Sequence, residues 1–144
     1  MRKAAARYGR ENEIKFLLAF RPLVADTEDA AWARSRELLA AAKAKYPAAP
    51  ALHQNVGSQR LRDAAAQGAV LDQRLWTEFA AVTGAHGNST ALVGTPQQVA
   101  DALLEYHRIG VDKFLIRGFD PVPDTLVFGR DVIPLVRAAV ARRG

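Results

Sequence analysis

The order of hydrophobic and polar positions predicts strands that alternate with helices. In the clearest case, the short apolar run 91–94 ends in glycine and a helix start follows at once. Thr95 has the side chain of an N-cap, Pro96 suits the first helical position, and Gln98 completes a capping box. Apolar residues then recur at the spacing of one helical face, at Val99, Ala102, Leu103 and Tyr106. The run 111–116 predicts the next strand, which this crossover makes parallel to the first.

Another strand is predicted upstream, over residues 13–24. Apolar residues occupy both of its alternating sets of positions, which is typical of a parallel strand covered on both sides. Asp26 and Thr27 are suitable helix caps, and acidic residues follow in the first turn, where the helix dipole favours them. The alanine-rich helix that begins there is expected to end near Tyr46, just before Pro47.

The stretch 51–83, between these two strands, predicts two further helices with a break near Gly68. Leu75 and Trp76 lie on one of the expected packing faces of these helices. The polar segment 84–89, which contains two glycines, predicts a loop.

Both ends of the chain are predicted to be helical. Residues 2–10 have the pattern of a helix finished by Gly9. After the last strand, the prolines of 121–123 predict an extended turn, and Asp124 is expected to cap the final helix. Pro134 is expected to kink that helix or to divide it in two.

Composition is that of an ordinary globular protein of one domain. The chain has 144 residues, of which 49% are hydrophobic and 24% are charged. No apolar run approaches the roughly 20 residues of a membrane span, and no secretory signal or cysteine is present, so a cytoplasmic location is expected. The net charge of +5 comes from scattered basic residues, so neither nucleic acid nor a membrane is an expected partner. No group of residues has metal-ligand spacing, so no metal is expected.

Three parallel strands, each followed by helix, predict an α/β protein whose sheet is incomplete. A flavodoxin-like open sheet normally has about five strands, and a closed β/α barrel has eight. In either case some strand edges of this chain lack a neighbour, and open edges pair with other chains or aggregate.

Three segments carry a resemblance to a known family: ALVGTPQQVADALL at 91–104, RGFDP at 117–121 and FGRDVIPLVR at 128–137. Together they resemble the C-terminal end of luciferase-like flavin-dependent monooxygenases, and the alkanesulfonate monooxygenase branch is the nearest. The likeness extends back to 26–32 and 14–16, so it spans nearly the whole chain.

The resemblance implies a fold, a cofactor and partners. Residues 1–144 would be the C-terminal part of a (β/α)8 TIM barrel with about three parallel strands, and a helical insertion would lie at about 47–89. Reduced FMN would be supplied by a separate flavin reductase, and O2 would oxidise a small organic substrate, an alkanesulfonate or a relative. The family's first strands and its flavin-phosphate loop have no counterpart in this sequence. We therefore expect a truncated or split product that is inactive alone, with a homo-oligomer or a complementary N-terminal chain as its partner.

Candidate site residues follow from the rule that β/α barrels carry their active sites at the C-terminal ends of the strands. Arg21 and Arg117 stand at two such ends, where their forked donors could bind a sulfonate or a flavin phosphate. Gly118 would allow close approach of a ligand to the backbone, and Phe119 could stack on flavin or substrate. His86, in the loop before the middle strand, could exchange a proton.

Each candidate also has a purely structural interpretation. Arg21 could pair with Asp26 or with a carboxylate on a missing strand of the barrel. Arg117 could pair with Asp120 or Asp124 and so shape the turn. The phenylalanine could be a core or lid residue, and the histidine could simply be solvated.

The sequence departs from the alkanesulfonate branch at several positions. Ala19 and Arg21 stand where that branch has an arginine and a histidine two residues apart. Ala85 stands in place of a lid arginine, and Phe119 stands in place of a tyrosine. These changes weaken the sulfonate interpretation more than the flavin interpretation. The alternative hypothesis is a non-catalytic fragment or interaction module that pairs through its open sheet edges.

Overall fold

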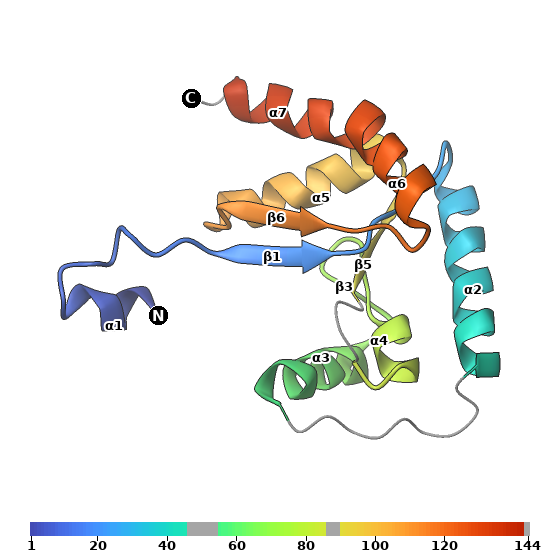
Figure 1. The fold of residues 1–144 in the computed structure, drawn as a ribbon, viewed down its shortest axis with the longest axis horizontal. Helices are drawn as coiled ribbons and strands as arrows, with labels where there is room; N and C mark the ends of the chain where they lie inside the picture. Colours follow the sequence, from blue (N-terminus) through green and yellow to red (C-terminus); the bar gives the residue numbers. More distant parts are fainter. Residues whose placement is uncertain (46–54, 86–89, 143–144) are drawn as a thin grey trace.

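Residues 1–45, 55–85 and 90–142 are described by a computed structural model (Figure 1). In chain order its elements are α1 (Arg2–Ala6), β1 (Leu17–Phe20), β2 (Leu23–Val24), α2 (Glu28–Lys45), α3 (Val56–Gln67), β3 (Val70–Leu71), β4 (Leu75–Trp76), α4 (Glu78–Val82), β5 (Ala91–Gly94), α5 (Pro96–Arg108), β6 (Lys113–Ile116), α6 (Pro121–Val127), the π-helical segment η1 (Phe128–Val132) and α7 (Ile133–Ala141). The expected α/β class is confirmed. The strands of the described residues form a two-stranded sheet, β1–β6, and a four-stranded sheet, β2–β5–β4–β3, and they do not close into a barrel.

The predicted parallel strands are present, although the first is shorter than expected. β1 pairs in parallel with β6, and β2 pairs in parallel with β5. The first strand begins at Leu17 and is divided into β1 and β2 at Arg21 and Pro22. Pro22 has no N–H to donate to a neighbouring strand, so pairing with β6 ends beside it.

The order of the strands places β5 and β6 on opposite edges of the first strand. The carbonyl of Phe20 accepts a hydrogen bond from the amide of Arg117 at 3.0 Å, and the amide of Arg21 donates to the carbonyl of Thr90 at 2.9 Å. The C=O of Phe20 and the N–H of Arg21 belong to one peptide group and point in opposite directions, so β6 lies on one side of the first strand and β5 on the other. The second edge of β5 is paired with the antiparallel hairpin β3–β4. In a closed barrel, each strand pairs with the next one along the chain, so β6 would occupy that edge of β5.

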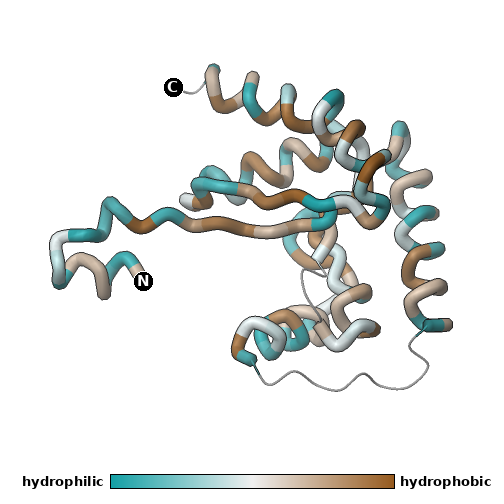
Figure 2. The backbone as a smooth tube through the Cα atoms, viewed as in Figure 1, coloured by the Kyte–Doolittle hydropathy of each residue, from teal (hydrophilic) through white to brown (hydrophobic). Residues whose placement is uncertain are grey.

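Two hydrophobic cores lie on opposite faces of the strands β2 and β5. Leu23 belongs to one core and Val24 to the other, and successive strand residues point to opposite faces. The buried members of the first core are Phe20, Val24, Leu92, Val99, Ala100, Ala102, Leu103, Phe128 and Val132. Those of the second core are Leu23, Ala31, Leu39, Trp76, Ala91 and Val93. Helix α5 therefore covers one face and α2 the other, and hydrophobic residues run through most of β1 and β6 (Figure 2).

The caps predicted at Thr27 and Thr95 are confirmed. The Thr95 hydroxyl accepts from the amide of Gln98, whose side chain accepts from the amide of Thr95, so the capping box of α5 is complete. The Thr27 hydroxyl accepts from the amide of Ala30 at 3.2 Å, at the start of α2. Both helices thus begin where the sequence predicts, directly after a parallel strand.

The prediction of helix around Leu75 and Trp76 is wrong, because these residues form β4 of a short hairpin. Trp76 is 1% exposed in the second core, and its indole N–H donates to Glu78 at 3.0 Å. The period of the apolar residues could not distinguish two-residue strands from a helix. Helices α3 and α4 are present on either side, and Gly68 ends α3 as predicted.

The C-terminal helix begins earlier than predicted. Pro121 occupies its first turn, because proline at that position loses no helical hydrogen bond, and the expected extended turn at 121–123 is absent. Asp124 therefore lies within the first turn, where its carboxylate accepts from the amide of Asp120 at 3.0 Å. The predicted interruption at Pro134 is confirmed, since η1 ends at Val132 and α7 follows. Across the described segments, none of the helices combines the length and the apolar character needed to cross a bilayer.

Candidate functional site

Four of the five predicted site residues meet at the C-terminal ends of β1 and β6. The guanidinium of Arg21 donates to the carbonyl of Gly118 at 3.2 Å. The same guanidinium lies 5.4 Å from the centroid of the Phe119 ring, within the range of a cation–π contact. Arg117 directly precedes these residues and follows β6. We refer to Arg21, Arg117, Gly118 and Phe119 as the strand-end cluster.

The strand-end cluster contains two positive charges close enough to repel each other. Burial lowers the pKa of the Arg21 guanidinium, and the positive charge of Arg117 lowers it further. An arginine stays protonated despite such a shift, so the repulsion persists at physiological pH. A bound anion would relieve it, and two guanidinium forks match the oxygens of a phosphate or sulfonate.

The structural interpretation of Arg117, an ion pair that shapes the turn, is not supported. Within the described residues, it makes no ion pair with Asp120 or Asp124. Asp124 instead pairs with Arg34 of α2 at 2.7 Å, and its side chain is 5% exposed. The side chain of Arg117 is exposed, so its charge is accessible from solvent.

Gly118 serves the packing of the turn after β6. A Cβ atom at this position would lie 2.4 Å from the Cβ of Asp124 and 2.7 Å from the carbonyl oxygen of Asp120. Any side chain here would therefore push the turn away from the start of α6. The close approach that the sequence suggests at Gly118 is thus made by the chain itself.

Phe119 is half-buried and is held on two sides. Its ring meets the ring of Phe79 edge to face, with centroids 5.0 Å apart at an angle of 78°. Arg21 lies over the ring, as described above. A shallow groove beside it runs between α2 and the turn after β6, lined by Arg34, Glu37, Leu38, Ala41, Phe119 and Asp120. The ring is therefore both a core residue and part of a groove wall.

Of the three histidines, only His107 belongs to the described residues, and it lies outside the strand-end cluster. His86 and His53 lie outside the described residues. The ring Nδ1 of His107 lies 3.0 Å from the carbonyl oxygen of Val111, at the exposed end of α5. Among the residues that the structure describes, no three side chains of the kinds that bind metals come together.

A polar network at the ends of β2 and β5 was not predicted from the sequence. Glu28, in the first turn of α2, accepts from Arg74 at 2.8 Å and from Gln98 at 2.7 Å. Arg74 also donates to the carbonyl of Val93 at 3.1 Å. Hydrogen bonds from Arg74 and then from Gln98 lower the pKa of Glu28 to about 2. The sequence marked Glu28 and Gln98 only as residues of helix starts. It did not predict the β3–β4 hairpin, which contains Arg74.

These observations define an open α/β protein with a cluster of two arginines at the ends of two parallel strands. The chain belongs to the luciferase-like monooxygenase family, whose family model matches residues 1–113. A crystal structure of riboflavin lyase, with modified FMN and its substrate riboflavin, has a similar fold. The two share 24% sequence identity and a TM-score of 0.61 over 96% of this chain. The chain spans 34% of the length of that lyase.

Proposed function

We propose that this chain is the C-terminal part of an FMN-dependent enzyme, in which Arg21 and Arg117 bind the anionic group of the flavin or of the substrate. The observation that carries the proposal is the pair of guanidiniums at the ends of β1 and β6; burial, and then the charge of Arg117, lower the pKa of Arg21. Membership of the luciferase-like family supports a flavin as the cofactor.

The residues present fit one part of such a cofactor. Two guanidiniums and the aromatic ring of Phe119 are suited to an anion attached to a planar or apolar group. The bound flavin would supply the redox chemistry. Arg21 would position the anion against Phe119, since it contacts both that ring and the backbone of Gly118. Arg117, being exposed, would add the second charge.

The finer activity that we propose is oxidation of a small organic substrate by O2, with reduced FMN delivered by a separate reductase. An alkanesulfonate or a related compound suits the cationic cluster. His86 is proposed as the group that exchanges a proton, from the segment that precedes β5. The chain spans a third of the compared lyase's length, so most of the walls around a flavin would come from further polypeptide. We therefore propose that the isolated chain shows no turnover with reduced FMN and octanesulfonate.

The proposal is tested by comparing FMN with riboflavin, which lacks the phosphate. Each flavin is titrated with the purified chain and its fluorescence anisotropy is followed at low ionic strength. We expect FMN to bind at least about fivefold more tightly, because charge-assisted hydrogen bonds contribute about 1.5–3 kcal/mol. In Arg117→Gln this preference should shrink to less than about twofold.

Arg137→Gln is the matched control, because it removes an exposed arginine from α7 and leaves the strand-end cluster intact. It should keep the wild-type preference apart from a small non-specific loss. Equal affinity of the wild type for FMN and riboflavin would overturn the assignment of the anion site. An equal loss of the preference for FMN in Arg117→Gln and Arg137→Gln would also overturn it.

A further inference from the structure

The ring of Phe119 in the strand-end cluster is supported from outside the two strands that carry the cluster. Phe79, in the short helix α4, meets this ring edge to face, with the two centroids 5.0 Å apart. Such a pair has a preferred geometry, because the positive edge of one ring is attracted to the negative face of the other. The guanidinium of Arg21 lies over the same ring, with its Cζ 5.4 Å from the centroid. Arg21 thus contacts Phe119, and Phe119 contacts Phe79.

Phe79 is itself held by the hairpin that precedes α4. Its ring centroid lies 5.9 Å from that of Trp76, which is 1% exposed in the second core. Thr77, which lies between them along the chain, is also buried, and its hydroxyl donates to the carbonyl of Gly68 at 2.6 Å. These contacts fix the start of α4 against the end of α3, so the ring of Phe79 rests on a well-packed base.

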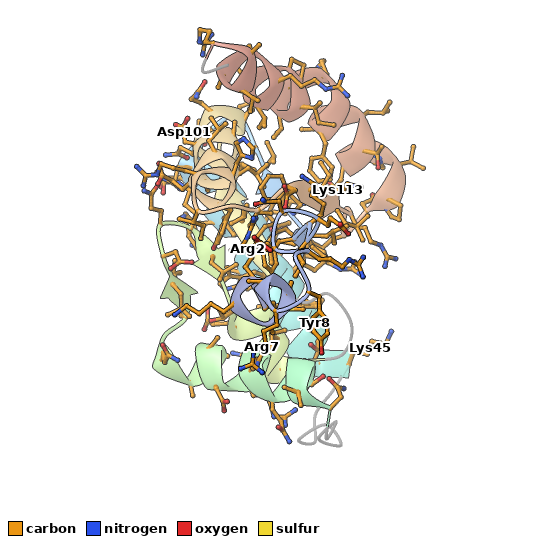
Figure 3. All side chains as sticks on the ribbon, turned by 90° about the vertical axis from the view of Figure 1, so that its left-hand side faces the viewer. Arg2, Arg7, Tyr8, Lys45, Asp101 and Lys113 are labelled. Atoms are coloured by element: carbon orange, nitrogen blue, oxygen red, sulfur yellow. The ribbon has the colours of Figure 1, made fainter. Side chains whose placement is uncertain are left out.

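The supporting segment belongs to the long stretch between the first strand and β5. Helix α4 packs against α3 and α2. In Figure 1 and in the turned view of Figure 3, α3 (green) lies on the other side of the strands from α7. Phe79 and Phe119 are partly buried against the same second core. This stretch therefore reaches the strand-end cluster through the side chain of Phe79.

The position of Arg21 needs such support. An arginine side chain has many rotamers, and holding it in one of them costs conformational entropy. The charge of Arg117 also repels its guanidinium. The hydrogen bond to Gly118 and the attraction of the Phe119 ring oppose both effects. If the ring of Phe119 turned freely, its face would lie beneath the guanidinium for less of the time.

We propose that Phe79 is a positioning residue of the anion site, which holds the ring of Phe119 so that the guanidinium of Arg21 stays in place for the bound anion. This inference rests on the proposed function of the strand-end cluster. Phe79 acts through Phe119 and not on the anion itself. Loss of its ring should therefore weaken anion binding at Arg21 without changing the charge of the site.

The first test needs no ligand and follows the Nε–Hε signal of Arg21 by NMR in the 15N-labelled chain. A proton above the face of an aromatic ring resonates upfield, so this signal reports how well the ring of Phe119 is placed. Phe79→Leu keeps apolar bulk but loses the ring, and we expect the Arg21 signal to move downfield. Phe79→Tyr keeps the ring and should keep the wild-type position. Val82→Ala is the matched control, because it trims a partly buried side chain of the same helix and the same core.

The second test measures the affinity of each variant for inorganic phosphate, at constant ionic strength, by the same signal. Phe79→Leu should bind phosphate at least about threefold more weakly, the size of one cation–π contact, whereas Phe79→Tyr and Val82→Ala should change by less than about 1.5-fold. Equal losses in Phe79→Leu and Val82→Ala would overturn the positioning role, because they would follow from packing alone.

The ligand-free comparison separates this inference from the proposed function. An Arg21 signal at the same position in the wild type and in Phe79→Leu would overturn the role of Phe79, whatever the phosphate affinity. A wild-type chain that does not bind phosphate would instead overturn the anion site at the strand-end cluster.

Discussion

The side chain of Arg21 donates a hydrogen bond to the carbonyl of Gly118 at 3.2 Å, across 97 positions of the chain. This contact joins the C-terminal ends of β1 and β6 at the place where the two strands stop pairing. It also holds the guanidinium over the ring of Phe119. The geometry of the strand-end cluster thus depends on the turn that contains Gly118, and that turn can be perturbed separately from the charges.

Replacing Gly118 by alanine should destabilise the protein. The added Cβ would lie 2.4 Å from a side-chain atom and 2.7 Å from a backbone atom, so the turn must move. We expect a loss of roughly 1–3 kcal/mol in the free energy of unfolding, the usual cost of overpacking. Urea denaturation followed by tryptophan fluorescence measures it. Gly129→Ala is the control, because no atom lies within 4 Å of its added Cβ. Equal stability of the two variants would contradict this account of Gly118.

The ion pair between Arg34 and Asp124 should stabilise the fold, because it compensates the charge of a buried carboxylate. Their side chains are 32% and 5% exposed, and the atoms lie 2.7 Å apart. Arg34→Met should lower the free energy of unfolding by about 3 kcal/mol, because it leaves the buried carboxylate of Asp124 without its ion-pair partner. Adding Asp124→Asn to this variant should recover part of that loss, because it removes the unpaired negative charge. A double-mutant cycle by urea denaturation measures the coupling, and additive losses would argue against the pair.

Acid should weaken the fold through Glu28. Its pKa is lowered from 4.5 to about 2 in the folded protein, so its carboxylate stabilises the fold above about pH 4.5. That contribution should be lost as the pH falls from about 4.5 to about 2. In Glu28→Gln, the decline in unfolding free energy over this interval should be smaller than in the wild type. Glu13→Gln removes only an exposed pair with Arg10, and should show the wild-type decline.

The capping box of α5 should contribute measurably to stability. Thr95→Ala removes the hydroxyl that accepts from the amide of Gln98, and we expect a loss of about 1 kcal/mol. Thr125→Ala is the comparison, because its exposed hydroxyl bonds only to a carbonyl within α6. That variant should lie within about 0.5 kcal/mol of the wild type. Thermal unfolding monitored by circular dichroism distinguishes the two, and a smaller loss in Thr95→Ala than in Thr125→Ala would contradict the capping role.

Local signals in the sequence were sufficient for most elements. The caps at Thr27 and Thr95 act within one helical turn, so they are readable without knowledge of the tertiary structure. The hairpin at β3 and β4 was missed because its strands have two residues each and are held by the edge of β5. The strand order could not be predicted from the sequence either, because pairing of β6 with β1 rather than β5 depends on contacts between distant segments.

For the candidate site too, local signals were predictable and long-range contacts were not. Arg21 and Arg117 were predicted from their places after apolar strands, and the structure brings these strand ends together. Asp124 was expected as a cap, but its buried pair with Arg34 links α2 to α6 across the fold. Arg74 carried no sequence signal, since its contact with Glu28 spans 46 positions. Charged residues whose partners lie far along the chain were thus the ones that sequence reasoning could not place.

The measurement that tests the central claim most directly is an NMR titration of the arginine Nε–Hε signals of the 15N-labelled chain. Inorganic phosphate is added first and FMN second, at constant ionic strength. The account predicts that the signals of Arg21 and Arg117 shift together, with one apparent affinity, while that of Arg130, held by Asp131, stays in place. Uniform small shifts of all exposed arginines, or shifts confined to arginines outside the strand-end cluster, would contradict an anion site at the ends of β1 and β6.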